Sequence, residues 1–197
     1  MELIFAAALC SVMVSILLKT GRNRGLNPIH LIAWNYATAS VLCYFWFKPD
    51  LAHVSVTHTP WLLIFVLGIL LPSVFLLLAR ALQTAGILKT EIAQRLSVVL
   101  SLAAAYFIFQ EQFSQLKIIG IGLGITAVIC ILLSNRNDTG TGIRGMLYLG
   151  LVWVGYALID VLLKYTTSLG LQFAVTLNLM FICAFILSMA YLLIKYH

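Results

Sequence analysis

The side chains that could do chemistry in this sequence gather in one apolar segment, residues 87–109. Thr90, Gln94, Ser97 and Ser101 follow one another at spacings of four, three and four residues. These spacings place them on one face of a helix, which we call the polar face. Hydroxyl and amide groups on one side of a membrane helix could line a path for a polar solute.

Two opposite charges, Glu91 and Arg95, flank this polar face and lie four residues apart. A charge at membrane depth costs about 2.5–3.5 kcal/mol on insertion scales, so it usually faces a cavity or a partner. Two interpretations stay open. Either the charges line a substrate pathway, or they only pair with each other near the start of the helix.

Three further polar residues lie in other apolar segments. Asp160 could accept a proton or bind a cationic group, or it could pair with Lys164 four residues later. Asn35 and Asn178 could hydrogen-bond a ligand or only a neighbouring helix, and helix packing is the favoured interpretation.

Aromatic residues accompany these polar positions: Trp34, Tyr36, Trp153 and Tyr156. Their rings could hold an organic substrate, but Trp and Tyr also collect where a membrane meets water. The predicted substrate-binding residues are Asn35, Glu91, Gln94, Arg95, Ser97, Tyr156 and Asp160.

The elements that must position these residues are membrane-spanning helices. The chain of 197 residues is 62% hydrophobic and 9% charged, too apolar for a soluble domain of this size. Apolar segments in lipid must satisfy their own backbone hydrogen bonds, which predicts an all-α, polytopic membrane protein. Seven spans are predicted, at Leu3–Leu18, Ile29–Phe47, Trp61–Leu82, Ile87–Phe109, Leu116–Leu133, Met146–Leu163 and Leu171–Ile194. Pro72 should kink the third.

A short tract repeats along the chain. Leu17-Leu18-Lys19, followed by Gly25, recurs as Leu162-Leu163-Lys164, followed by Gly170, an offset of 145 residues (17 to 162). Five spans lie within one period, and an odd number of crossings inverts the second copy, as in many secondary transporters. The predicted domains are a five-span repeat at 1–134, a linker at 135–145 and two spans of an inverted second repeat at 146–197.

Other classes of function find no support in the sequence. No catalytic triad, metalloprotease motif, phosphate loop or carboxylate pair is visible, so we expect neither an enzyme nor a bound cofactor. The four cysteines and four histidines are scattered without metal-ligand spacing. The net charge of +6 indicates cytoplasmic loops rather than nucleic-acid binding. The expected partners are the lipid bilayer and a small-molecule substrate.

The fourth and fifth spans carry a recognisable pattern. The run from Thr84-Ala85-Gly86 to Glu111, followed by Ser114 and Gly120, resembles the EamA-type domain of the drug/metabolite transporter superfamily. That family closes its fourth span with a Gly-Glu pair, has a serine three residues later and starts its fifth span with a glycine. The segments His30–Ala39 and Gly155–Lys164 also resemble the corresponding segments of proteins in this superfamily. Two positions depart from the pattern: Gln110 replaces the glycine, and Val98 replaces a proline.

The resemblance implies a secondary-active transporter of small organic metabolites or drugs that works by alternating access in the plasma (inner) membrane. Its full form has ten spans, so the predicted seven imply that the chain recruits a second subunit for the missing spans. The alternative is a truncated, inactive fragment or a subunit that only packs with others. A seven-span receptor is a weaker alternative. Lys and Arg counts favour an amino terminus outside, whereas the family usually has it inside, so orientation stays open.

Overall fold

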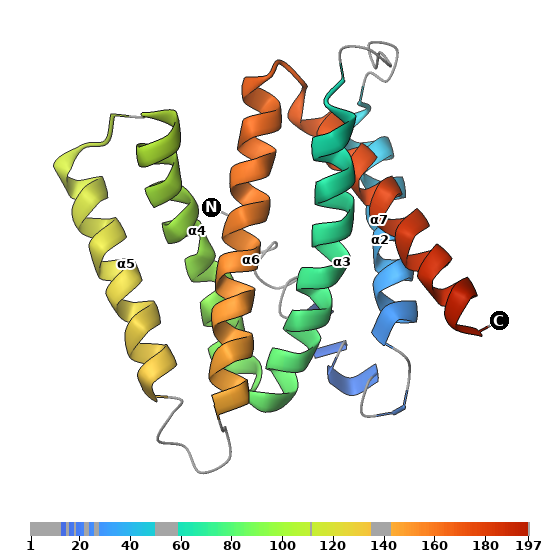
Figure 1. Ribbon diagram of the computed structural model, residues 1–197, viewed down its shortest axis with the longest axis horizontal. Coiled ribbons are helices and arrows are strands. Elements are labelled where there is room, and N and C mark those ends of the chain that lie inside the picture. The colour runs from blue at the N-terminus through green and yellow to red at the C-terminus, as the bar shows by residue number, and fades with distance from the viewer. Residues whose placement is uncertain are drawn as a thin grey trace. The chain divides into compact units, whose positions relative to one another are not determined.

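The computed structural model describes residues 13–14, 16–17, 19–21, 24–25, 28–49, 59–110, 112–134 and 143–196. The regular structure within these residues is helical, and they contain no strand. The helices are α2 (Pro28–Phe47), α3 (Trp61–Thr84), α4 (Ile87–Phe109), α5 (Gln115–Ser134), α6 (Ile143–Ser168) and α7 (Phe173–Tyr196) (Figure 1).

These six helices coincide with the second to seventh predicted spans. Helix α6 runs on to Ser168, beyond the predicted end of the sixth span at Leu163, and so includes Lys164. Within the described residues, α3, α4, α6 and α7 are long and apolar enough to cross a membrane, and α5 has a shorter apolar stretch, Gln115–Ala127. The protein is therefore a multi-pass membrane protein. The first predicted span falls largely outside the described residues, so the number of crossings stays a prediction.

The chain forms two compact units. One contains Leu76–Leu158 with the residues before position 27, and the other contains Asn27–Phe75 and Ile159–His197. The first unit therefore holds α4, α5, the end of α3 and most of α6. The second holds α2, α7, the start of α3 and the end of α6. Pro72 lies inside α3, and the kink expected there stays a prediction.

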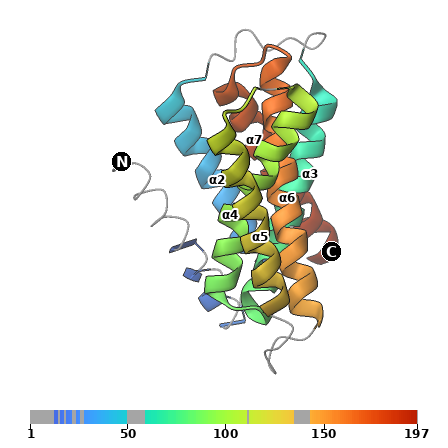
Figure 2. The same cartoon turned by 90° about the vertical axis from the view of Figure 1, so that its left-hand side faces the viewer.

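In the first unit, α4 and α5 form a hairpin: they lie side by side in Figure 1, and α5 lies in front of α4 in Figure 2. They approach closely at Gly124, where a Cβ atom would come within 2.5 Å of the Val99 side chain. The spacing Gly120-x-x-x-Gly124 allows close helix approach, and α5 makes such an approach at Gly124. At Gly120 a Cβ atom would meet no described atom within 4 Å.

In the second unit, α2 and α7 pack against each other in an antiparallel arrangement (Figure 1). Tyr36 stacks on Phe181 with ring centroids 6.0 Å apart, and the Asn178 amide donates to the Ser40 carbonyl at 3.0 Å. Residue numbers rise along α2 as they fall along α7, which defines the antiparallel direction. Tyr36 and Asn178 are both only 1% exposed, so these contacts form the centre of the unit.

Candidate functional site

The polar face lies on α4 in the first unit, and its hydroxyl groups bond to their own helix. Thr90 Oγ donates to the Gly86 carbonyl at 2.7 Å, and Ser97 Oγ donates to the Gln94 carbonyl at 2.6 Å. Thr90 and Ser97 are almost fully buried, and Ser101 Oγ bonds in the same way to the Val98 carbonyl. The O–H group of each of these side chains already donates a hydrogen bond. Each hydroxyl oxygen can still accept a hydrogen bond from a ligand.

Gln94 differs from its neighbours on the polar face. Its side-chain carbonyl oxygen, Oε1, is buried and has no hydrogen-bond partner among the described residues. A buried acceptor that lacks a partner costs about 1–3 kcal/mol. Native structures rarely tolerate that cost without a bound donor or a functional reason. Gln94 therefore presents an acceptor for the N–H or O–H group of a ligand.

The two charged residues pair with each other. Arg95 Nη2 lies 3.5 Å from Glu91 Oε2, and the pair follows the i, i+4 spacing of a helix. The Glu91 side chain is only 8% exposed, whereas the Arg95 side chain is 47% exposed. The pairing that the sequence left open is thus present. It is asymmetric, with a buried carboxylate and a guanidinium that reaches outward.

Helix α6 contacts α4 through an aromatic residue in the same unit. The indole N–H of Trp153 donates to the Leu96 carbonyl at 3.1 Å, so this backbone oxygen of α4 is held by another helix. Tyr156, one turn further along α6, is half-buried. Trp153 therefore acts in helix packing. Trp34 on α2 is 64% exposed, which favours the membrane-facing interpretation for that ring.

The remaining predicted site residues lie in the second unit, and both are half-buried: Asn35 on α2 and Asp160 on α6. Asn178 serves in packing, as expected, since its amide bonds across to the Ser40 carbonyl of α2. The first unit thus brings together Glu91, Gln94, Arg95 and Ser97 on one helix, and it also contains Tyr156 on α6. Within the described residues no group of His, Cys, Asp and Glu side chains could hold a metal ion.

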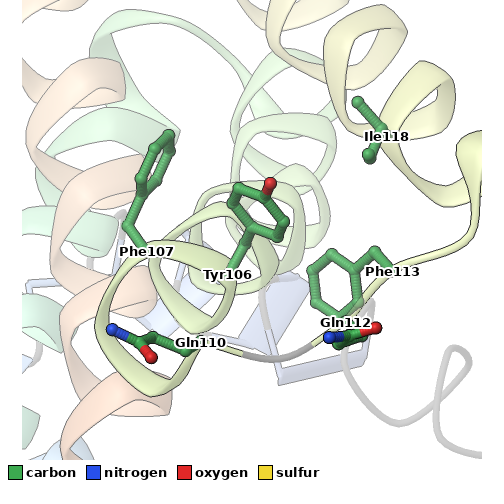
Figure 3. Close-up of a pocket in the computed structure, with 6 residues that line it drawn as sticks. All are labelled: Tyr106, Phe107, Gln110, Gln112, Phe113 and Ile118. Atoms are coloured by element: carbon green, nitrogen blue, oxygen red, sulfur yellow. The ribbon is translucent and has the colours of Figure 1, made fainter.

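The structure also reveals a pocket that sequence reasoning missed. A cavity of about 410 Å³ lies where α4 passes into α5, and its lining residues are Tyr106, Phe107, Gln110, Gln112, Phe113 and Ile118 (Figure 3). Gln110 adopts a left-handed backbone conformation there, with φ of 50°. The sequence did contain a signal. The EamA pattern places a glycine at this position, and glycine is the residue that favours this conformation at a helix end.

The rest of that motif surrounds the start of α5. Ser114 precedes the helix, and its carbonyl accepts hydrogen bonds from the backbone N–H groups of Lys117 and Ile118 at 2.9 and 3.2 Å. A serine at a helix start is a common cap. Glu111 lies outside the described residues.

Comparison with known proteins assigns this arrangement to a class of membrane transporters. Residues 1–133 match the model of the EamA-like transporter family, and the chain belongs to that family. A curated relative, an uncharacterized protein of Haemophilus influenzae strain Rd, is 40% identical over 202 residues. That alignment covers 98% of this chain and 68% of the relative. No solved structure matches the chain.

Proposed function

We propose that this protein is a secondary-active transporter of small organic solutes, and that the polar face of α4 lines its pathway. The observation that carries this proposal is the buried Oε1 atom of Gln94, which has no partner in the described part of the chain and lies beside the Glu91–Arg95 pair. Apolar membrane helices rarely keep such groups unless a solute or an ion uses them. Membership of a transporter family supports the same function.

The pair also suggests how a solute would bind. Glu91 is buried, while Arg95 reaches outward at a distance of 3.5 Å, which is long for a charge-assisted hydrogen bond. A solute ammonium group could replace Arg95 at the carboxylate, and a solute carboxylate could engage the released guanidinium. Gln94 would accept a further N–H bond. Zwitterions such as amino acids suit these three groups, with coupling to a proton or to exchange.

We further propose that the chain contains one five-span repeat, at 1–134, and two spans of an inverted second repeat, at 146–197. Local geometry supports the offset of 145 residues. Gly25 and Gly170 both have a left-handed backbone, with φ of 79° and 93°. The residue before each glycine also makes the same backbone hydrogen bond, to the carbonyl four residues earlier. The Arg24 N–H donates to the Thr20 carbonyl at 3.0 Å, and the Leu169 N–H donates to the Tyr165 carbonyl at 3.2 Å.

The contact between α2 and α7 supports the same arrangement. Under this offset, α7 is the second-repeat counterpart of α2, and Phe181 is the counterpart of Tyr36. Two inverted copies related by a two-fold axis pack antiparallel, and a residue on that axis contacts its own counterpart. Tyr36 and Phe181 stack on each other in this way. In this scheme Tyr156 on α6, in the same unit as the polar face, supplies a further substrate contact in an inner-membrane transporter. Asn35 and Asp160 lie in the second unit, and their part in substrate binding stays a prediction.

The transport proposal is tested by solute counterflow in proteoliposomes that contain the full-length protein and a mixture of labelled organic solutes, amino acids first. We expect Arg95→Gln to abolish uptake of the solute that the unmodified protein accumulates, with membrane insertion intact. Arg144→Gln is the matched control, because Arg144 is an exposed arginine at the start of α6. Unchanged uptake by the Arg95 variant would remove this residue from the pathway.

The repeat proposal has its own test. In a cysteine-free background, Lys19→Cys and Lys164→Cys should react with a membrane-impermeant maleimide from opposite sides, because an odd number of crossings separates the two copies. Labelling of both positions from one side would contradict the inverted repeat and leave the transport assay unaffected.

A further inference from the structure

The pocket between α4 and α5 lies at the level where a membrane helix ends. Helix α4 is one of the helices apolar and long enough to span the bilayer, and the pocket begins in its last turn, at Tyr106 and Phe107. Tyr and other aromatic side chains at such helix ends typically sit among lipid headgroups. The volume of about 410 Å³ falls in the range, about 300–1,000 Å³, of sites that bind small molecules.

One side of the pocket is aromatic and carries a cation. The Tyr106 ring lies 5.8 Å from the Phe113 ring, and both line the pocket (Figure 3). Lys117 Nζ lies 4.7 Å from the centroid of Phe113, so a cation–π interaction holds the ammonium group against a residue that lines the pocket. At this side of the pocket, the ammonium group of Lys117 can pair with an anionic group.

The pocket also has neutral hydrogen-bonding side chains and exposed apolar side chains. Gln110 and Gln112 are exposed and carry amide N–H donors that suit phosphate or ester oxygens. Phe107 is 77% exposed and Ile118 is 48% exposed. A free phosphate ion would leave these two apolar side chains uncovered, whereas the acyl chain of a lipid would lie along them.

We propose that this pocket binds an anionic phospholipid, with its phosphate on Lys117 and its first acyl methylenes against Phe107 and Ile118. The left-handed backbone at Gln110 ends α4 and turns the chain, so that Gln112 and Phe113 line the same pocket as the last turn of the helix. The lipid would bridge α4 and α5 at their connection. The site is separate from the polar face, so its test does not depend on transport.

The experiment is native mass spectrometry of the full-length protein in mild detergent, titrated with phosphatidylglycerol. We expect Lys117→Gln to weaken phosphatidylglycerol binding about fivefold, the effect of one lysine near an anionic lipid surface. Lys117→Arg should retain binding. The matched control is Lys48→Gln, which removes an exposed lysine at the end of another helix, α2, and should leave binding unchanged.

Two further arms keep the proposal falsifiable. Ile118→Ser should also weaken phosphatidylglycerol binding, and this variant tests the acyl contact if Lys117→Gln fails to fold. Millimolar inorganic phosphate should not displace the lipid. Equal binding by Lys117→Gln and the unmodified protein would overturn the proposal, as would displacement by phosphate, which would identify a site for the free anion.

Discussion

Two buried amide groups behave differently: Asn178 in the α2–α7 pair and Gln94 in α4. The Asn178 amide crosses to the Ser40 carbonyl of the neighbouring helix at 3.0 Å. Gln94 Oε1 has no partner among the described residues, and its neighbours Thr90 and Ser97 donate to backbone carbonyls four and three residues earlier. The Asn178 amide therefore joins two helices, whereas the Gln94 oxygen joins none of the described ones.

This difference is the physical basis of the proposed role of Gln94 in transport. An interhelical hydrogen bond in a membrane contributes about 0.6 kcal/mol on average, which suffices to explain an asparagine at a helix contact. A buried acceptor without a partner is unfavourable, so stability cannot explain Gln94. The Glu91 carboxylate beside it, 8% exposed, strengthens the contrast.

The largest expected effect follows from removing the Gln94 acceptor. Gln94→Leu should lower solute uptake about tenfold, equivalent to about 1.4 kcal/mol of lost interaction. The same variant should raise the thermal stability slightly, because a buried unsatisfied group is gone. Uptake in proteoliposomes and the melting temperature in detergent measure the two effects.

The control for Gln94 comes from the other unit. Ser188 on α7 also has a buried hydroxyl without a partner among the described residues. Ser188→Ala should leave uptake unchanged, because this residue is assigned no role in transport. Normal uptake by Gln94→Leu would contradict the proposed role of Gln94 in transport.

The next effect concerns the close approach of α4 and α5. Gly124→Ala should lower the free energy of unfolding by about 1–3 kcal/mol, since the new methyl group would overlap the Val99 side chain. Gly122→Ala is the matched control on the same helix, because its Cβ would meet no described atom within 4 Å. Thermal unfolding in detergent compares the two. Equal melting temperatures would show that the hairpin relaxes at no cost.

A smaller effect is expected where α2 meets α7. Asn178→Leu should lower the free energy of unfolding by about 1 kcal/mol, because the bond to the Ser40 carbonyl is lost. Uptake per folded molecule should not change. Thr166→Val is the control, since this buried hydroxyl bonds only to the Leu163 carbonyl of its own helix, at 2.7 Å. Loss of uptake in Asn178→Leu would assign this asparagine to the transport pathway.

The smallest effect should appear at the end of α4. Gln110→Gly should raise the free energy of unfolding by about 0.5–1 kcal/mol, since glycine adopts the left-handed conformation without the penalty that Gln110 incurs at φ of 50°. Gln112→Gly, two residues away and without a positive φ, should bring no gain. The melting temperatures of the two variants in detergent, each compared with that of the unmodified protein, measure the difference.

Much of the fold was predictable from the sequence because apolar length dictates membrane helices. The predicted second, fourth and seventh spans agree with α2, α4 and α7 to within two residues at each end. The end of α6 was not predictable from hydropathy, because a helix can continue past the apolar core into polar residues such as Thr166 and Ser168. Apolarity limits the membrane segment, not the hydrogen-bonded helix.

The candidate site was predictable only in part. Helical spacing placed Glu91 beside Arg95, and the structure has that pair. Spacing could not tell that Thr90 would bond to its own backbone while Gln94 kept a buried acceptor, since both outcomes depend on rotamers and on neighbouring helices. The bond from Trp153 to the Leu96 carbonyl joins residues far apart in the sequence, which no local pattern encodes.

The stacked rings of Tyr36 and Phe181 have a consequence for the history of the chain. Under the proposed repeat, both positions were one residue before a gene duplication, and two separate copies of the shorter ancestor would have met there, ring against identical ring. Any substitution would then have altered both halves of the contact at once. Fusion into a single polypeptide would have freed each half to change alone, and the phenolic hydroxyl that Tyr36 carries and Phe181 lacks would be a trace of that freedom.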